Sequence, residues 1–347
     1  AKSEDIEKYK GKYDAGWDEL RKQRFERQQE LGVVSDQALL PDRNFELNHA
    51  VKPWDELTSL EKELFARYQE IFAGMVDNVD QNFKRLRDEL EQMDEWDNTI
   101  IIFTSDNGGS REGQELGTSA YFRTLLAFTG HTDLESTELD HSRIDLLGGP
   151  RSLAHYPMGW AMTSNTPFRL YKTNTHQGGQ QVPLIVHWQK GLPSDDQLRH
   201  QYQHVTDLLP TICELVGIEI PTSKGEEQLP PAAGNSFASS LTNPSADSTH
   251  SEQYYEMIGH RGMYKDGWSA STIRQPETVF SEEHWELHDL RNDPTESVDL
   301  SGKYPEKVEY MKSLWEEVAW ENQVFPLDEG NNVKNILRPP WNEKLFQ

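Results

Sequence analysis

Apolar residues recur at helical spacing in two segments of this chain. Over residues 57–93 they stand every three or four positions, which predicts one long amphipathic helix with an uninterrupted buried stripe. Thr58, followed three residues later by Glu61, predicts a capping box at its start. The stretch "HVTDLLPTICELVGI" predicts a second helix, with Pro210 in its first turn and Gly217 at its end.

Two short apolar runs indicate strands. Ile100–Phe103 is unbroken by polar residues, which is typical of a strand buried on both faces in a parallel sheet, and the glycines that follow favour a strand over a buried helix. The run "VPLIVHW" at residues 182–188 predicts a strand of the same sheet. Residues 253–325 alternate in shorter runs instead, which predicts a small antiparallel sheet crossed by a helix.

These patterns divide the chain into three parts within an α/β fold. Residues 1–220 form the expected α/β core, in which the irregular stretch of about 111–166, with several histidines and glycines, is typical of a lid over a site. Residues 221–250 are rich in Pro, Ser, Thr and Gly and predict a linker. Residues 251–347 form the expected C-terminal antiparallel subdomain.

Composition limits the kinds of partner that the chain can bind. With 34 basic and 59 acidic residues among 347, the net charge is −25, so nucleic acid and other polyanions are repelled overall. No apolar run approaches the length of a membrane span.

The single cysteine, Cys213, excludes an internal disulfide and is predicted to be a buried thiol. The first residues lack a signal peptide and an initiator Met, which suggests part of a longer protein.

Candidate chemistry lies in the loops at the ends of the two strands. Asp106 and Asn107 follow the first strand, and their oxygens are hard donors suited to calcium or magnesium; the alternative is an Asp-Asn-Gly turn without chemistry. Lys172 precedes the second strand, where an ammonium group could pair with an anion or simply be a solvated surface charge. His176, beside a Gly-Gly turn, is a turn residue or a ligand.

Four segments in order resemble one family. They are "YQEIFAGMVDNVDQNFKRLRDELEQMDEWDNTIIIFTSDNGGS", "PFRLYKTNTHQGGQQVPLIVHW", "HVTDLLPTICELVGI" and "WELHDLRNDPTESVDL". Together they resemble the latter part of type I sulfatases, and most closely bacterial arylsulfatases of the alkaline phosphatase superfamily. The resemblance implies an alkaline-phosphatase-like fold, a mostly parallel sheet flanked by helices with a small C-terminal antiparallel sheet plus helix. It also implies a sulfuric ester hydrolase that acts on a sulfate ester.

The resemblance assigns roles to the candidate residues. Asp106 and Asn107 would be two calcium ligands, Lys172 would be the catalytic and substrate-binding contact to the sulfate group, and His176 could donate a proton to the leaving group. The family's nucleophile is a formylglycine made from Cys or Ser in a Cys/Ser-x-Pro-x-Arg stretch. Cys213 is not in such a stretch, and "SNTPFR" has one residue too many before its proline. We therefore expect a carboxy-terminal portion of a sulfatase that is inactive alone, its nucleophile lying outside this chain.

Other readings of the same residues stay open. A phosphodiesterase or phosphonate monoester hydrolase of the same superfamily typically has His where Asn107 stands, because two-metal phosphoryl chemistry uses an imidazole ligand. A non-catalytic sulfatase-like binding protein would share the fold and lack the nucleophile. Carbohydrate, aryl and alkyl sulfates are all open as substrates, and so is the oligomeric state. Only the resemblance favours a periplasmic or secreted location.

Overall fold

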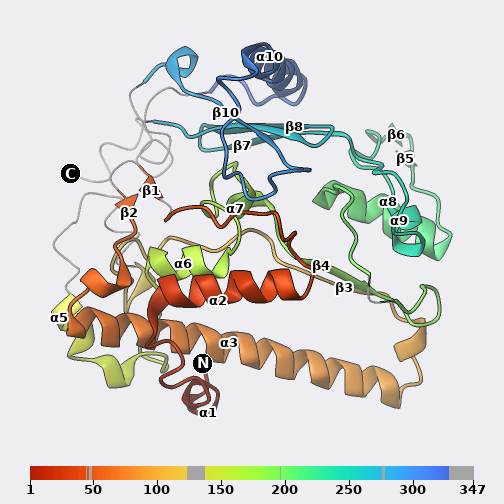
Figure 1. The fold of residues 1–347 in the computed structure, drawn as a ribbon. Helices are drawn as coiled ribbons and strands as arrows, with labels where there is room; N and C mark the ends of the chain where they lie inside the picture. The colour runs from red at the N-terminus through yellow and green to blue at the C-terminus, as the bar shows by residue number, and fades with distance from the viewer. Residues whose placement is uncertain (44, 47–48, 123–136, 196, 276–277, 328–347) are drawn as a thin grey trace, which may run out of the picture.

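Helices and strands both build the chain, as the α/β prediction requires. The computed structural model describes residues 1–43, 45–46, 49–122, 137–195, 197–275 and 278–327. The longest of the described helices, α3 (Ser59–Gln92), runs along one side of the molecule, and α10 (Pro305–Glu321) lies at the opposite side with a sheet beneath it (Figure 1). The candidate site lies in loops between these two layers.

The start of α3 is the predicted capping box. Thr58 Oγ1 accepts a hydrogen bond from the backbone N–H of Glu61 (3.2 Å), and Glu61 Oε2 accepts one from the backbone N–H of Thr58 (2.7 Å). Two N–H groups that the first helical turn leaves without partners are thereby satisfied. The predicted position and type of this helix are confirmed.

Only the first half of the apolar stripe of α3 is buried. Leu64, Tyr68 and Ile71 are buried, whereas Met75 and Val79 are 41% and 53% exposed. The prediction of an uninterrupted buried stripe is therefore wrong for the second half of the helix. Helical periodicity shows which face of a helix could be buried, but it does not show which part of that face another element covers.

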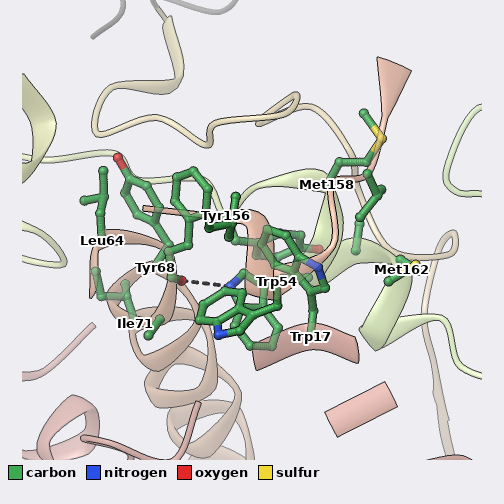
Figure 2. Packing of buried hydrophobic residues seen from close by; sticks show 14 of the residues in the cluster. Trp17, Trp54, Leu64, Tyr68, Ile71, Tyr156, Met158 and Met162 are labelled. Carbon is green, nitrogen blue, oxygen red and sulfur yellow. Dashed lines mark hydrogen bonds between the residues drawn. The ribbon is translucent and has the colours of Figure 1, made fainter. Parts of the chain in front are cut away.

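The main core lies where α2 (Gly16–Glu30) and α6 (Met158–Ser164) meet α3 (Figure 2). Trp17 packs edge-on against Trp54, with ring centroids 4.8 Å apart, and against Trp160 at 5.8 Å. The indole N–H of Trp160 donates to a backbone carbonyl of α3 at 2.8 Å, which satisfies a buried polar group. This aromatic cluster fixes α6 to the helical layer.

The stretch predicted as a lid contributes to this core. Its last part is α6, whose Trp160 and Met162 are fully buried. Before it, α5 (Thr137–His141) packs on α3, and a short helix η3 (Ile144–Leu146) follows. Residues 123–136 of the predicted lid lie outside the described residues. A covering role for the stretch stays a prediction.

The two predicted strands pair, but not as expected. β3 (Ile101–Thr104) pairs with β4 (Leu184–His187) in one two-stranded sheet, which confirms that both runs are strands of the same sheet. Their direction is antiparallel, so the parallel arrangement expected for them is wrong. Full burial is also wrong, because Phe103 and Ile185 are 47% and 57% exposed. An unbroken apolar run allows burial on both faces, but covering elements decide whether burial occurs.

The C-terminal part of the chain contains the predicted antiparallel sheet. Its four strands are β7 (Glu252–Met257), β8 (His260–Lys265), β9 (Trp268–Thr272) and β10 (Glu286–Asp289), hydrogen-bonded in the order β10-β9-β8-β7. All three ladders are antiparallel. Tight turns join β7 to β8 and β8 to β9, whereas a longer segment joins β9 to β10.

Helix α10 crosses that sheet and forms a second core with it. Trp315 and Met311 of the helix are buried against Met263 and Leu287 of the strands. The Trp315 indole N–H also donates to the backbone oxygen of Tyr255 (2.9 Å). The expected sheet crossed by a helix is therefore present, with its own hydrophobic core.

The second predicted helix is α8 (Leu208–Val216), preceded by a short helix η4 (Val205–Asp207). Gly217 ends α8 in the left-handed conformation, with φ of 72°, as its position predicted. Cys213 is half-buried, so the prediction of a buried thiol is wrong. It lies on a face of α8 that is only partly covered.

The predicted linker carries short elements of its own. They are the hairpin strands β5 (Ser223–Lys224) and β6 (Glu227–Gln228) and the helix α9 (Ala238–Thr242). Phe237, just before α9, is buried, and its backbone N–H donates to Thr211 Oγ1 of α8 (3.0 Å). This segment is therefore anchored to α8, and the division of the chain into three parts stays a prediction.

Short elements complete the described fold. They are α1 (Ser3–Glu7), β1 (Phe45–Glu46), β2 (His49–Ala50), η1 (Trp54–Glu56), η2 (Trp96–Asn98), α7 (Gln177–Gln180) and η5 (Phe280–Glu282). Within the described part of the chain, none of the helices combines the length and the apolar character needed to cross a membrane.

Candidate active site

The loop after β3 presents the two predicted metal ligands. Asp106 is exposed and Asn107 is half-buried. Ser105 Oγ donates to the backbone oxygen of Asn107 (2.9 Å), and the Asn107 side-chain Nδ2 donates to the backbone oxygen of Gly108 (2.7 Å). Because the amide nitrogen is directed to the backbone, the amide oxygen is the atom that can face a cation beside the Asp106 carboxylate.

The loop that carries Lys172 lies directly against the loop after β3. The Lys172 backbone N–H donates to Gly109 O (3.1 Å), and the Gly108 N–H donates to Gly179 O (3.2 Å). Asn165 bridges the two loops, since its Oδ1 accepts from the Gly109 N–H (2.5 Å) and its Nδ2 donates to two carbonyls of the second loop (2.7 and 2.9 Å). The structure thus brings together the two segments that the sequence singled out.

The Lys172 ammonium group is one end of a chain of polar side chains. Its Nζ lies 2.8 Å from Glu112 Oε1, and the two side chains are 31% and 30% exposed. Ser110 Oγ donates to Glu112 Oε2 (2.6 Å) and lies 3.0 Å from His155 Nε2. At the far end, His155 Nδ1 lies 2.9 Å from the backbone oxygen of Tyr156. A cation expected to meet sulfate is therefore held by a carboxylate.

The sequence did not point to three of these hydrogen-bonded side chains, which are Ser110, Glu112 and His155. Ser110 and Glu112 come directly after the Asp-Asn-Gly-Gly turn, and that closeness in sequence was the only signal for them. His155 lies far along the chain, in the stretch predicted as a lid, and the backbone hydrogen bonds that pair it with Thr118 bring it back to the site (2.8 and 2.9 Å). Nothing in local periodicity indicates such a return.

The surroundings of these hydrogen-bonded side chains shift the pKa values of Glu112, His155 and the neighbouring Tyr156. Burial alone would raise the pKa of Glu112, but hydrogen bonds from Lys172 and Ser110 outweigh it and lower that pKa. Burial lowers the pKa of His155. Burial also raises the pKa of Tyr156 to about 12. At neutral pH Glu112 is therefore a carboxylate, the ionic partner that the Lys172 ammonium requires.

His176 is placed against the C-terminal sheet. Its side chain is only 1% exposed, and its Nε2 lies 3.4 Å from Glu286 Oε2 on β10. The same Glu286 carboxylate accepts hydrogen bonds from Arg169 (2.7 Å) and His288 (3.1 Å). Burial would raise the pKa of Glu286, but these three cationic or histidine neighbours hold it well below its usual range. A role for His176 as a proton donor stays a prediction.

Asp106 and Asn107 fit calcium in the kind of donor that they offer. Carboxylate and amide oxygens are hard ligands, and calcium takes about six to eight of them. Over the ranges that the structure describes, no group of three or more His, Cys, Asp or Glu side chains is arranged to hold a metal ion. The loop after β3 therefore offers two oxygen donors of the kind that calcium takes, and their role as ligands stays a prediction.

Comparison with known proteins decides the family. The family profile described as Sulfatase matches residues 1–218, more than half of the chain. The chain belongs to the sulfatase family. The resemblance read from the four sequence segments is confirmed, and so is the mixed α/β class with a C-terminal antiparallel sheet plus helix.

Two sequence relatives and one solved structure are similar to this sulfatase chain. An uncharacterized sulfatase of Schizosaccharomyces pombe is 30% identical over 333 residues, which cover 95% of this chain and 57% of that protein. An arylsulfatase of Klebsiella aerogenes is 28% identical over 239 residues, covering 69% and 47%. The crystal structure of a Pseudoalteromonas sulfatase aligns with 74% of this chain and 44% of its own, at 17% identity and a TM-score of 0.43. The chain spans about half the length of the sequence relatives it matches.

Proposed function

We propose that this chain supplies part of the active site of a sulfuric ester hydrolase. The observation that carries the proposal is the hydrogen bond from the Lys172 backbone N–H to Gly109 O, which seats the lysine beside the loop of Asp106 and Asn107. The lysine cation suits the anionic sulfate group directly, and the two oxygen donors suit a metal cation that would bind the same group. Membership of the sulfatase family supplies the reaction type.

In this proposal Lys172 binds the sulfate group of the ester. Hydrolysis shifts negative charge toward the leaving alcohol oxygen while the sulfate oxygens stay charged. An ammonium group already held in place stabilises that charge without having to reorganise as the reaction proceeds. The backbone of Lys172 is fixed by Gly109, and its side chain is fixed by Glu112, so both ends of the residue are restrained.

We propose Asp106 and Asn107 as two ligands of a calcium ion. When bound, calcium acts as a Lewis acid toward the sulfate oxygens. Asp106 contributes a full negative charge from an exposed position, and Asn107 contributes a neutral amide oxygen whose orientation is set by its hydrogen bond to Gly108. Loss of Asp106 therefore weakens cation binding more than loss of Asn107.

We also propose that the nucleophile, a formylglycine, is supplied from outside residues 1–347. No Cys or Ser of this sequence stands in a Cys/Ser-x-Pro-x-Arg pattern. Cys213 lies half-buried on α8 and is followed by Glu-Leu-Val. The groups in this chain bind and orient the sulfate ester, but they do not replace a covalent nucleophile.

His176 has two roles to separate. As a proton donor it must reach the leaving alcohol, whereas its imidazole is buried against Glu286. We propose that it joins the Lys172 loop to β10, with proton donation as a second function. The phosphodiesterase and phosphonate monoester hydrolase alternative is not favoured, since Asn107 supplies no imidazole ligand and the family match is to sulfatases.

Activity and calcium binding together test the proposal. In the longer protein that carries this chain and the nucleophile motif, Lys172→Ala should lower kcat with p-nitrophenyl sulfate by about 10²- to 10³-fold, the usual cost of removing one charge-stabilising group. Calcium titration should show weaker binding in Asp106→Ala than in Asn107→Ala. Residues 1–347 alone should hydrolyse no ester.

Three results would count against the proposal. Unchanged calcium affinity in Asp106→Ala would remove that residue from the metal site. Calcium-dependent turnover by residues 1–347 alone, abolished by Lys172→Ala, would place the nucleophile inside this chain. Bound sulfate without turnover in the longer protein would favour the non-catalytic binding alternative.

A further inference from the structure

A carboxylate beside the sulfate-binding lysine is unexpected, because it repels the anion that the lysine attracts. Glu112 Oε1 lies 2.8 Å from Lys172 Nζ. A substrate anion that contacts this ammonium group therefore also meets the negative charge of Glu112. A carboxylate there weakens anion binding by electrostatics alone. Its presence calls for another function.

The geometry supplies that function through the position of the ammonium group. Lysine has a flexible four-carbon stem and three N–H donors. Glu112 receives one N–H of Lys172 and fixes where the nitrogen stands, which leaves two donors that can meet sulfate oxygens. A nitrogen that is already fixed does not have to lose its freedom when the substrate binds.

Glu112 is itself held from the other side. Its Oε2 accepts a hydrogen bond from Ser110 Oγ (2.6 Å), and its backbone N–H donates a hydrogen bond to Ser110 Oγ (3.3 Å). His155 Nε2 lies 3.0 Å from Ser110 Oγ and, because the single hydroxyl proton of Ser110 goes to Glu112, it is Nε2 that must carry the proton of this contact; the ring Nδ1 lies 2.9 Å from the backbone oxygen of Tyr156. Both oxygens of the carboxylate therefore have partners, so the carboxylate is held between Lys172 and Ser110.

Close backbone packing makes this arrangement possible. A Cβ on Gly113 would stand 2.1 Å from Tyr156 O and 2.8 Å from His155 Nδ1. The first contact is with the backbone, which cannot move aside cheaply, so a side chain at this position would push the segment of His155 away from Ser110. Gly113, the residue after Glu112, has no Cβ, and this is what lets His155 approach Ser110.

We propose that Glu112 is a positioning residue that fixes the Lys172 ammonium group for sulfate, with Ser110 and His155 holding Glu112 in turn. The inference rests on the proposed sulfate-binding role of Lys172. It assigns to three residues outside the predicted site a common task, and it explains why an anion site contains a carboxylate. Glu112 itself does not contact the sulfate group.

Chemical labelling of lysines tests the inference on residues 1–347, without any need for turnover. Acetic anhydride acetylates a lysine only after the amine has left its ion pair and lost a proton, and mass spectrometry follows each lysine separately. Glu112→Gln should speed acetylation of Lys172 about two- to fivefold, the range that a partly exposed ion pair supports. Ser110→Ala should speed it less, because the carboxylate remains but is held from one side.

A second ion pair of similar exposure provides the matched control. Lys265 Nζ lies 3.1 Å from Glu252 Oε2, and the two side chains are 27% and 35% exposed. Glu252→Gln should speed acetylation of Lys265 and leave Lys172 unchanged. An unchanged Lys172 rate in Glu112→Gln would overturn the inference, and so would an equal rise at Lys265, which would indicate that the whole fold had loosened.

Inorganic sulfate separates this inference from the proposed function. In the unaltered chain, sulfate should slow acetylation of Lys172 but not of Lys265. In Glu112→Gln, half protection should need about two- to fivefold more sulfate, because the loss of positioning outweighs the loss of the repelling charge; half protection at the same or a lower sulfate concentration would show that Glu112 only repels the anion, and would overturn the inference. Absence of protection in the unaltered chain would refute sulfate binding by Lys172, while the effect of Glu112→Gln on the rate without sulfate would still test the positioning.

Discussion

Gly108 and Gly178 lie where the two loops of the candidate site touch. A Cβ on Gly108 would stand 1.7 Å from Gly178 O, and one on Gly178 would stand 2.0 Å from Arg169 O. Both contacts are with backbone oxygens, which cannot swing away as the end of a side chain can. The absence of side chains at these two residues lets Lys172 come beside Gly109.

Gly108→Ala should therefore separate the loops. We expect it to lower the free energy of unfolding by about 1–3 kcal/mol, the usual cost of forcing an extra carbon into a packed position. Urea unfolding followed by tryptophan fluorescence measures this. Gly302→Ala is the control, because a Cβ there would meet nothing within 4 Å. Equal unfolding free energies for the two variants would show that the loops adjust freely.

At the scale of elements, α3 shows how far local signals reach. The sequence predicted its length and its cap, because both depend on residues within a few positions of each other. The same sequence did not predict that the stripe is covered only in its first half. Covering depends on α1, α2 and α6, which belong to distant parts of the chain.

Thr58→Ala should remove the cap of α3. We expect the free energy of unfolding to fall by about 1 kcal/mol, since the backbone N–H of Glu61 loses its partner. Thr222→Ala, at an exposed position outside any helix, is the matched control and should change little. Urea titration of both variants gives the comparison. A loss in Thr222→Ala as large as in Thr58→Ala would remove the cap as the cause.

The strand pair β3 and β4 has one feature that local signals predicted and one that they did not. The apolar runs predicted the strands themselves, because four apolar residues followed by glycines mark a strand end. The antiparallel direction of the pair was not predictable, because it is set by the path of the long segment between the two strands. Strand direction is a property of that connection rather than of the strand sequence.

At the scale of the whole molecule, one buried ion pair joins three segments. Asp207 is fully buried at the start of α8, and its Oδ1 accepts from His250 Nδ1, just before β7, and from the backbone N–H of Asn235 in the predicted linker, each at 2.8 Å. The hydrogen bond to Asp207 raises the pKa of His250. Burial would raise the pKa of Asp207, but the hydrogen bonds that it accepts, first from His250, lower it.

This pair predicts how stability depends on pH. The raised pKa of His250 gives stability that is complete below its unfolded pKa of about 6.5 and is lost as pH rises through the folded value. The lowered pKa of Asp207 gives stability that is complete above about 3.9 and is lost as pH falls through the folded value. The pair therefore stabilises the fold most between about pH 4 and 6.5.

His250→Gln should reduce this dependence. From about pH 5.5 to about pH 8.5, the free energy of unfolding should fall more in the unaltered chain than in the variant, because glutamine does not titrate. Urea titration of both proteins at both pH values measures the difference, and subtraction removes other groups that titrate in this range. An equal fall in the two proteins would show that the pair of Asp207 and His250 does not link folding to pH.

The sequence by itself determined the helices α3 and α8, the positions of the strands, the C-terminal sheet with α10, and the family. These follow from periodicity and from motifs, in which interacting residues are close along the chain. The sequence also named the two loops of the candidate site, because polar residues at strand ends stand out against apolar runs.

Only the tertiary structure decided what those loop residues meet. It paired Lys172 with Glu112, returned His155 to Ser110, and turned His176 toward β10. All three contacts, like the direction of β3 against β4, join segments separated by tens of residues. Such contacts exist only when the chain closes long loops, and the free energy that selects them comes from burial and hydrogen bonding at the meeting point, which no local pattern records.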